Sequence, residues 1–426
     1  MKRVLAEAMF TPRSGRLLRR LFGYGQAVSL LALLSAGGCA HTRDSGRSSL
    51  NPAQSGQVTN LEMEPVQIEV GRGANGSDEL VAFDAPTLFE EGGAHMDGNR
   101  FAEAVTSFDR LLKNFPDSGY APPALFNAAL SQEILGQFAD AAARYRQVTE
   151  QFPDARVAKE ASLRLGACYA ELGRWPASIE SLEAALKRPD LNLSERVETM
   201  SRVGLGYFEI KDLTSAERVF RETLSYYQAH QEEERIESPF FVAMAQFYQA
   251  HLSHRRFREL PLRGAQKQLQ QDIETLAKGF IATNDGYVAA IRYKDPFWAS
   301  AAGFHIGALY RELYDTLIKA PVPVELNELQ RLFYSDMLKG QLKTLLEKAQ
   351  GVLQKNVEWA SRVGVKNGWI EKSSEQLEEL SRLLAAIDTQ PVGPSVPTPT
   401  PKTDAPLTPP RPLRHSPGDT RPRSLL

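Results

Sequence analysis

The sequence predicts an all-α protein, a solenoid of antiparallel helix pairs followed by a further helical block. Two observations lead to this prediction. A pattern of 37 or 38 residues recurs through the first half of the folded region, and self-similarity at such a period is typical of stacked repeats. Beyond it, apolar residues keep a spacing of three or four positions, which indicates helices. Apolar residues make up 42% of the chain, enough for a substantial core.

Residues 1–38 are predicted to be an export signal and not part of the fold. Six Lys and Arg side chains precede an apolar run over residues 27–34, and this run is too short to span a bilayer as a helix, which takes about 20 apolar residues. Small residues and then Cys39 follow, an arrangement that resembles the lipobox of bacterial lipoproteins, although Ala36 stands where those signals usually have Leu. The resemblance implies cleavage before Cys39 and a covalent lipid on its thiol; an ordinary secretory signal is the alternative.

Residues 39–84 are polar and contain two glycine- and serine-rich stretches. We expect this segment to be a flexible tether between the membrane and the folded body. Its glycine cluster over residues 71–77 lacks the Lys-Ser/Thr ending of a phosphate-binding loop.

The repeat itself occupies residues 85–228. Its motif begins at Phe101 and returns at Phe138, Trp175 and Leu213. Two small residues, twelve positions apart, mark every copy: Gly92 and Ala104, Ala129 and Ala141, Gly166 and Ser178, Gly204 and Ala216. This pattern resembles the tetratricopeptide repeat, which implies helix pairs whose backbones approach at the small residues. A proline after the second helix would end it, because proline lacks an amide hydrogen.

In such an array the first helix of each pair lines one wall, here called the inner wall. Asn127, Arg164 and Arg202 fall at equivalent positions of successive repeats, and apolar residues accompany them. The candidate partner-binding groove therefore consists of Phe126, Asn127, Leu130, Leu163, Arg164, Arg202 and Leu205; a merely solvated wall is the alternative. The Lys and Asn with which related proteins hold a peptide carboxylate are replaced in the first repeat by Glu90 and Gly93.

Cys168, on a first helix, is predicted to be a small buried thiol.

The C-terminal helical block is expected over residues 238–387, with degenerate repeats. A helix should begin at Asp295-Pro296, since Asp is a favoured cap and Pro a favoured first residue. A long helix through Leu338 and Ala360 and a last one over residues 369–387 should follow. Residues 390–426 are rich in proline, which predicts a disordered tail.

The stretch from Tyr293 to Tyr314, together with Ala320-Pro-Val-Pro323 and Asn367-Gly-Trp-Ile-Glu371, resembles repeat lipoproteins of myxobacteria, among them tetratricopeptide outer-membrane lipoproteins of the adventurous gliding-motility complex. The resemblance implies a periplasm-facing scaffold, anchored in the outer membrane, that binds protein partners of an envelope-spanning machine. A barrel-assembly or pilus-secretin pilot lipoprotein is the alternative, although such proteins lack a long C-terminal block.

Other function classes find little support in the sequence. A formal net charge of −2 gives no attraction to nucleic acid, and no hydrolase, metalloprotease or phosphate-loop motif occurs. We therefore expect no enzyme and no cofactor beyond the lipid; a periplasmic enzyme is the third alternative, and an apolar pocket with converging acid and base groups would favour it. His251 and His254 are three residues apart, but Arg255, Arg256 and Arg258 adjoin them, so no metal site is expected.

Overall fold

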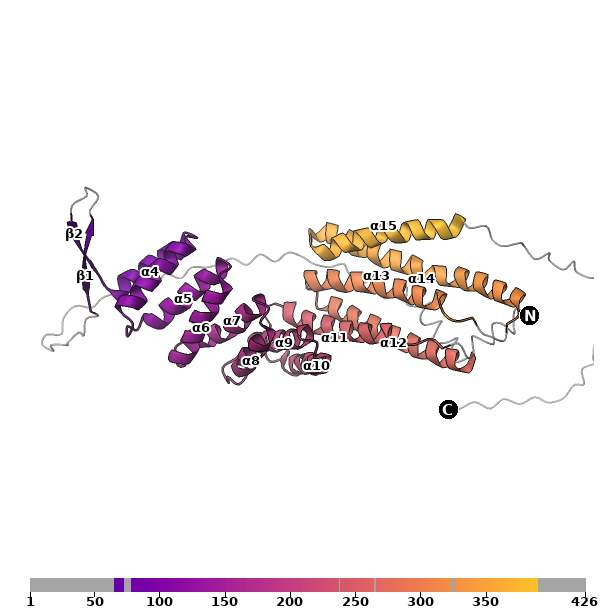
Figure 1. The fold of residues 1–426 in the computed structure, drawn as a ribbon, viewed down its shortest axis with the longest axis horizontal. Coiled ribbons are helices and arrows are strands. Elements are labelled where there is room, and N and C mark those ends of the chain that lie inside the picture. Colours follow the sequence, from indigo (N-terminus) through magenta and orange to yellow (C-terminus); the bar gives the residue numbers. More distant parts are fainter. Residues whose placement is uncertain (1–64, 73–77, 237, 264–265, 323–325, 390–426) are drawn as a thin grey trace, which may run out of the picture.

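The computed structural model describes residues 65–72, 78–236, 238–263, 266–322 and 326–389. A short hairpin at one end leads into an elongated stack of helices, and a bundle of longer helices forms the other end (Figure 1). Within the described residues thirteen helices dominate, so the predicted all-α fold class is confirmed. The repeat array consists of α3 (Ala85–Asp97), α4 (Phe101–Asn114), α5 (Ala121–Ile134), α6 (Phe138–Gln151), α7 (Ala158–Glu171), α8 (Trp175–Ala185), α9 (Leu193–Glu209) and α10 (Leu213–His230).

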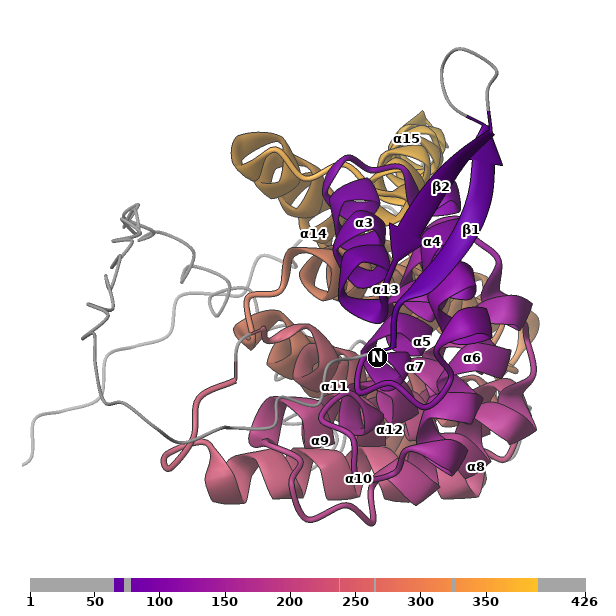
Figure 2. The same ribbon diagram turned by 90° about the vertical axis from the view of Figure 1, so that its left-hand side faces the viewer.

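The helices of the array pack in sequence order, each against the next. Figure 2 shows α4, α6 and α8 along one side of the stack, with α3, α5 and α7 nearer its middle. The first helices of the pairs therefore share one face, as the repeat pattern predicted.

The small residues of the motif lie where the two helices of a pair cross. A Cβ added to Gly92 would come within 2.5 Å of the Phe108 ring, and one added to Gly204 within 2.6 Å of Phe220. At the third pair Gly166 meets Leu182 in the same way, at 2.4 Å. Because real Cβ atoms essentially never approach so closely, a larger residue at these positions would force the facing side chain to shift. The small residues therefore lie at the helix crossings, as the repeat register predicted.

The turn inside each pair repeats as well. Asn99, Gly136, Gly173 and Lys211, spaced 37, 37 and 38 residues apart, all have positive φ angles, between 55° and 75°. This left-handed conformation suits glycine and, less well, asparagine. Lys211 is the one member of the four with a long side chain.

The segment predicted to be a flexible tether contains a β-hairpin. Strands β1 (Gln67–Arg72) and β2 (Asp78–Phe83) pair antiparallel, with Val70 opposite Leu80. Phe83 is buried against Phe115 and beneath the Arg110 guanidinium, 3.8 Å from the ring centroid. The alternation of apolar side chains at 66, 68 and 70 is a strand pattern, which the polar composition of the whole segment obscured. Four apolar side chains on this hairpin are more than half exposed: Val66, Ile68, Val70 and Leu80.

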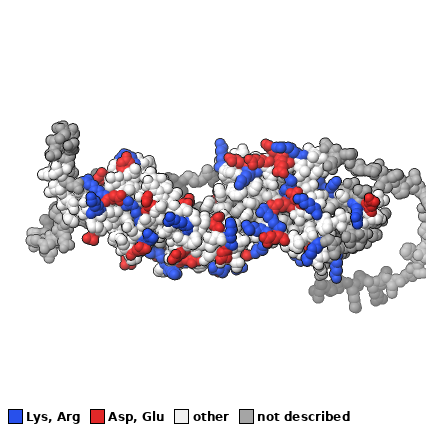
Figure 3. Space-filling view, viewed as in Figure 1, with Lys and Arg blue, Asp and Glu red and all other residues white. Residues whose placement is uncertain are grey.

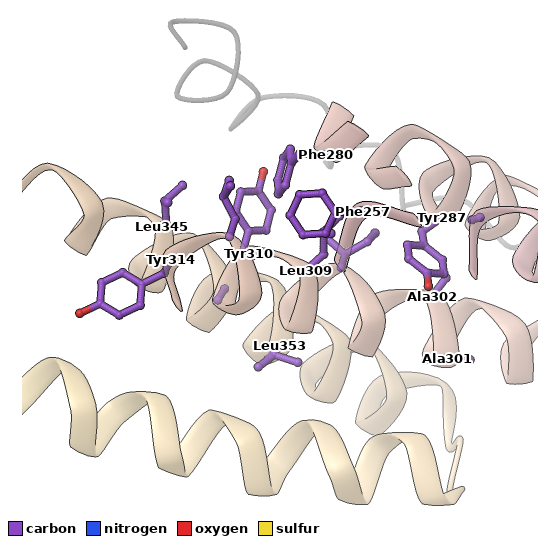
Figure 4. Packing of buried hydrophobic residues seen from close by; sticks show 14 of the residues in the cluster. Phe257, Phe280, Tyr287, Ala301, Ala302, Leu309, Tyr310, Tyr314, Leu345 and Leu353 are labelled. Carbon is purple, nitrogen blue, oxygen red and sulfur yellow. The ribbon is translucent and has the colours of Figure 1, made fainter. Parts of the chain in front are cut away.

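The C-terminal block begins where the array ends. Asp295 caps α13 by accepting the Trp298 amide at 2.9 Å, with Pro296 at the first position as predicted. Aromatic and aliphatic side chains from neighbouring helices fill a large core, in which Figure 4 shows Phe280 and Tyr310 side by side. The helices are α11 (Phe240–Arg258), α12 (Gln266–Arg292), α13 (Pro296–Ile318), α14 (Glu328–Val363) and α15 (Gly368–Thr389).

Several predictions concern residues outside the described ranges. The signal at 1–38, the lipidation site Cys39 and the proline-rich tail at 390–426 are among them. Within the described part, none of the helices is both long enough and apolar enough to cross a membrane.

Candidate functional site: the inner wall of the repeat array

The inner wall is formed by α5, α7 and α9, and all seven predicted groove residues are half-buried on it. Phe126 rests on Tyr145 of the same repeat, with ring centroids 5.6 Å apart. Leu205, at the other end, packs against the core of the C-terminal block. The seven residues therefore extend from the second repeat to the junction with that block, and each keeps part of its surface accessible.

Arg164 is held by the chain's own carboxylates. Its Nε donates to Glu160 on the preceding turn of α7 at 2.8 Å, and its Nη1 lies 3.2 Å from Glu133 at the end of α5. Glu133 also accepts the hydroxyl of Tyr145 at 2.8 Å. These contacts link two repeats and fix the guanidinium in place, while 32% of the Arg164 side chain stays exposed.

Arg202 is held in a similar way one repeat further on. Its Nε donates to Glu198 at 2.9 Å, and its guanidinium lies 4.9 Å from the centroid of the Phe241 ring in α11. Its side chain is also 32% exposed. Each of the two predicted arginines therefore already has a carboxylate neighbour and is not a free cation.

Paired charges of this kind make the wall suited to a polypeptide and not to a bare anion. A neighbouring carboxylate offsets much of the attraction that each arginine would exert on an anionic ligand. A polypeptide, in contrast, brings donors and acceptors together with apolar side chains that Phe126, Leu130 and Leu163 can contact. Positive and negative side chains are interspersed over the whole face seen in Figure 3, without a large field of one sign.

Two segments of the array match known sequence families. Residues 124–192 and residues 87–118 each match a tetratricopeptide repeat profile. These segments are tetratricopeptide repeats. The array is thus a tetratricopeptide-type solenoid that serves as a scaffold for protein–protein interaction.

The solved structures that resemble this chain share little of its sequence. A tetratricopeptide repeat protein of Parabacteroides merdae is 15% identical, with a TM-score of 0.33, over 71% of this chain and 98% of its own. A MamA segment from Desulfovibrio magneticus RS-1 is 14% identical, with a TM-score of 0.34, over 48% of this chain and 96% of its own. These scores are too low for either structure to bear on function. No curated protein matches the sequence.

A second group of polar side chains lies in the C-terminal block, and it includes His251 and His254, for which the sequence predicts no metal site because of the adjoining arginines. His305 of α13 joins His251 and His254 of α11 inside the aromatic core, and each histidine places a ring nitrogen within 4.8 Å of the others. Burial lowers the pKa of His251 to about 4 and that of His305 to about 3. Both rings are therefore neutral at pH 7. His305 lies 51 residues after His254, so only the packing of α13 on α11 reveals the trio.

The predicted thiol is also where the sequence placed it. Cys168 is a free, buried cysteine on α7, with 1% of its surface exposed. Burial raises its pKa to about 12, so at neutral pH it stays a thiol and packs as a small apolar side chain. The interpretation as a core residue is confirmed.

Proposed function

We propose that this protein is a lipid-anchored scaffold that faces the periplasm from the outer membrane and captures protein partners on the inner wall. The observation that carries the proposal is the alignment of Asn127, Arg164 and Arg202 in successive repeats, with both arginines fixed by neighbouring carboxylates and still a third exposed. Interface energy usually concentrates in a few arginine and aromatic side chains that are held in place before binding.

The anchor and the machine are the finer part of the proposal. The apolar run before Cys39 and the small residues beside it favour lipidation of that cysteine. The resemblance of residues 293–314 and of the segments near 320 and 367 to myxobacterial repeat lipoproteins favours an envelope-spanning gliding-motility complex. The five helices that the structure describes in the C-terminal block favour this role over that of a barrel-assembly or pilus-secretin pilot, which consists mainly of repeats.

The binding role is tested by changing both inner-wall arginines, Arg164→Ala with Arg202→Ala. We expect partner capture from cells to fall at least about tenfold, which corresponds to about 1.4 kcal/mol, while helix content stays unchanged. The matched control is Arg146→Ala with Arg221→Ala, which removes the same charge from exposed positions of the second helices α6 and α10. This control should capture the partner as the wild type does.

A deletion from residue 390 onward completes the design. Ordering a proline-rich tail costs entropy and gains few apolar contacts, so this truncation should leave capture nearly intact. Loss of capture by the truncation, with full capture by the inner-wall double variant, would move recognition from the array to the tail.

The choice of machine is tested separately, by deleting the gene. Loss of gliding by cells that lack pili is the expected phenotype. Depletion of outer-membrane barrels or of the secretin, with gliding preserved, would favour the pilot role instead.

A further inference from the structure

The three histidines of the C-terminal block converge from two helices. His251 and His254 lie one turn apart on α11, and His305 reaches them from α13. His254 is fully buried and His305 is 8% exposed, whereas His251 is only half-buried. One nitrogen from each ring lies within 4.8 Å of the other two, a separation that modest side-chain movement can reduce until all three nitrogens contact one ion.

One of these nitrogens has no partner within the described residues. His305 Nδ1 is buried and makes no hydrogen bond there. Leaving a buried polar atom unsatisfied costs about 1–3 kcal/mol of folding free energy. A ligand bound to His305 Nδ1 would remove this cost. We propose that His251, His254 and His305 together bind one divalent transition-metal ion, of the class of Zn²⁺ or Co²⁺.

The surroundings of His254 fit this proposal. Its Nε2 donates to Glu312 on α13 at 2.9 Å, which directs the other nitrogen, Nδ1, toward the shared space. Arg258 holds Glu312 through two hydrogen bonds, at 2.8 and 2.6 Å. Metal-ligating histidines usually donate their second ring N–H to a carboxylate in this way, which fixes the tautomer and raises the basicity of the ligating nitrogen.

Tyr287 of α12 marks the position between two of the rings. Its hydroxyl lies 3.0 Å from His254 Nδ1 and 3.3 Å from His251 Nδ1. The Tyr287 hydroxyl can donate one proton to one of these nitrogens and accept an N–H from the other, so the two rings and the phenol share one small polar space. Figure 4 shows the Tyr287 ring reaching toward α13 beside Ala302. Bound metal would take the lone pairs and leave the phenol as a neighbour or a fourth ligand.

The donor set selects the class of ion. Three imidazole nitrogens suit Zn²⁺, Co²⁺, Ni²⁺ or Cu²⁺, whereas Mg²⁺ and Ca²⁺ prefer oxygen ligands. Zinc–nitrogen bonds of about 2.0–2.1 Å require the three nitrogens to close to about 3.4 Å. Arg258 is neutralised by Glu312, but Arg255 remains nearby as an opposing charge. The free energy of coordination must exceed that repulsion. Because His251 is only half-buried, an ion can reach the site past this side chain.

Such an ion would bind α11 to α13. Because α11 also packs on α9 and α10 of the last repeat, the occupied site would stiffen the region beside the Leu205 end of the inner wall. The inference concerns the stability of this block and does not depend on the proposed partner or machine.

The test uses the purified full chain, stripped with a chelator and then titrated with Co²⁺. We expect one Co²⁺ per chain, with the visible absorption of low-coordinate cobalt, displacement by Zn²⁺ and a higher melting temperature. His305→Phe keeps an aromatic ring in the core and should abolish the absorption and the metal-induced shift. His95→Phe, on α3 and outside the trio, is the matched control and should preserve both.

A second variant keeps the test informative if His305→Phe fails to fold. Glu312→Gln keeps all three ligands and should weaken Zn²⁺ about 10- to 100-fold, as loss of an outer-shell partner does. The absence of stoichiometric Co²⁺ or Zn²⁺ binding by the folded wild type would overturn the proposal. Equal binding by His305→Phe would overturn it as well, since the ion would then lie elsewhere.

Discussion

At the scale of single residues, the array depends on positions that tolerate few side chains. The crossing glycines touch a ring or a leucine of the partner helix, and the turns inside the pairs require a left-handed residue. Evolution has placed Gly at two of these four turns, Asn at one and Lys at the fourth. Lys211 is therefore expected to lower the free energy of unfolding, and a single substitution should remove this cost.

Lys211→Gly should stabilise the protein. Lys211 has a φ of 69°, a conformation that costs a residue with a Cβ about 1–2 kcal/mol. Glycine loses about 0.5–1 kcal/mol of that gain through its greater entropy when unfolded. We expect a net gain of up to about 1.5 kcal/mol in the free energy of unfolding, measured by denaturant titration. The reverse change at the equivalent turn, Gly173→Lys, should destabilise; a gain there would show that the turn conformation is misassigned.

At the scale of elements, the sequence predicted most of what the structure shows. Small residues at fixed spacing located every helix crossing of the array, and Asp295-Pro296 located the start of α13. The hairpin was missed because its apolar alternation is short and lies in a polar segment. The histidine trio was missed because its third member comes from another helix. A contact between α11 and α13 produces no characteristic residue spacing in the sequence.

Ala141→Trp tests the helix crossing of the second repeat. Ala141 is fully buried on α6, in a core cluster that includes Leu125 and Ala129 of α5. Added bulk in a packed core costs about 1–3 kcal/mol, and occasionally more, so we expect a loss of several kcal/mol and a clear fall in melting temperature. Ala139→Trp, two residues earlier and exposed, is the control and should change little. Equal melting temperatures for the two variants would count against the repeat register.

At the scale of the whole molecule, the folded body joins two segments of different character. An array with an accessible inner wall adjoins a block with a large aromatic core (Figure 1). The proposed lipid at Cys39 would tether both to a membrane, since two acyl chains give lasting attachment where one does not. This arrangement would leave the inner wall free to hold a partner at some distance from the bilayer.

Cys39→Ser tests the anchor. Without the thiol no diacylglycerol can be attached, so the variant should leave the membrane fraction, either as a soluble periplasmic species or as an uncleaved precursor. Fractionation of cells followed by immunoblotting measures this, with Cys168→Ser as the matched control that should stay membrane-bound. A Cys39→Ser protein that migrates as the mature form and still sediments with membranes would contradict lipidation.

The central claim, that the inner wall holds a protein partner, is tested most directly by crosslinking in cells. A photoreactive residue replaces Asn127, which is half-buried on the inner wall. In the control it replaces Arg146, which is exposed on the second helix α6 of the same repeat. We expect a discrete adduct of one size from position 127 that disappears when Arg164 and Arg202 are changed to alanine, and no such adduct from position 146. An adduct from position 146 alone, or one from position 127 that persists in the double variant, would contradict partner binding on the inner wall.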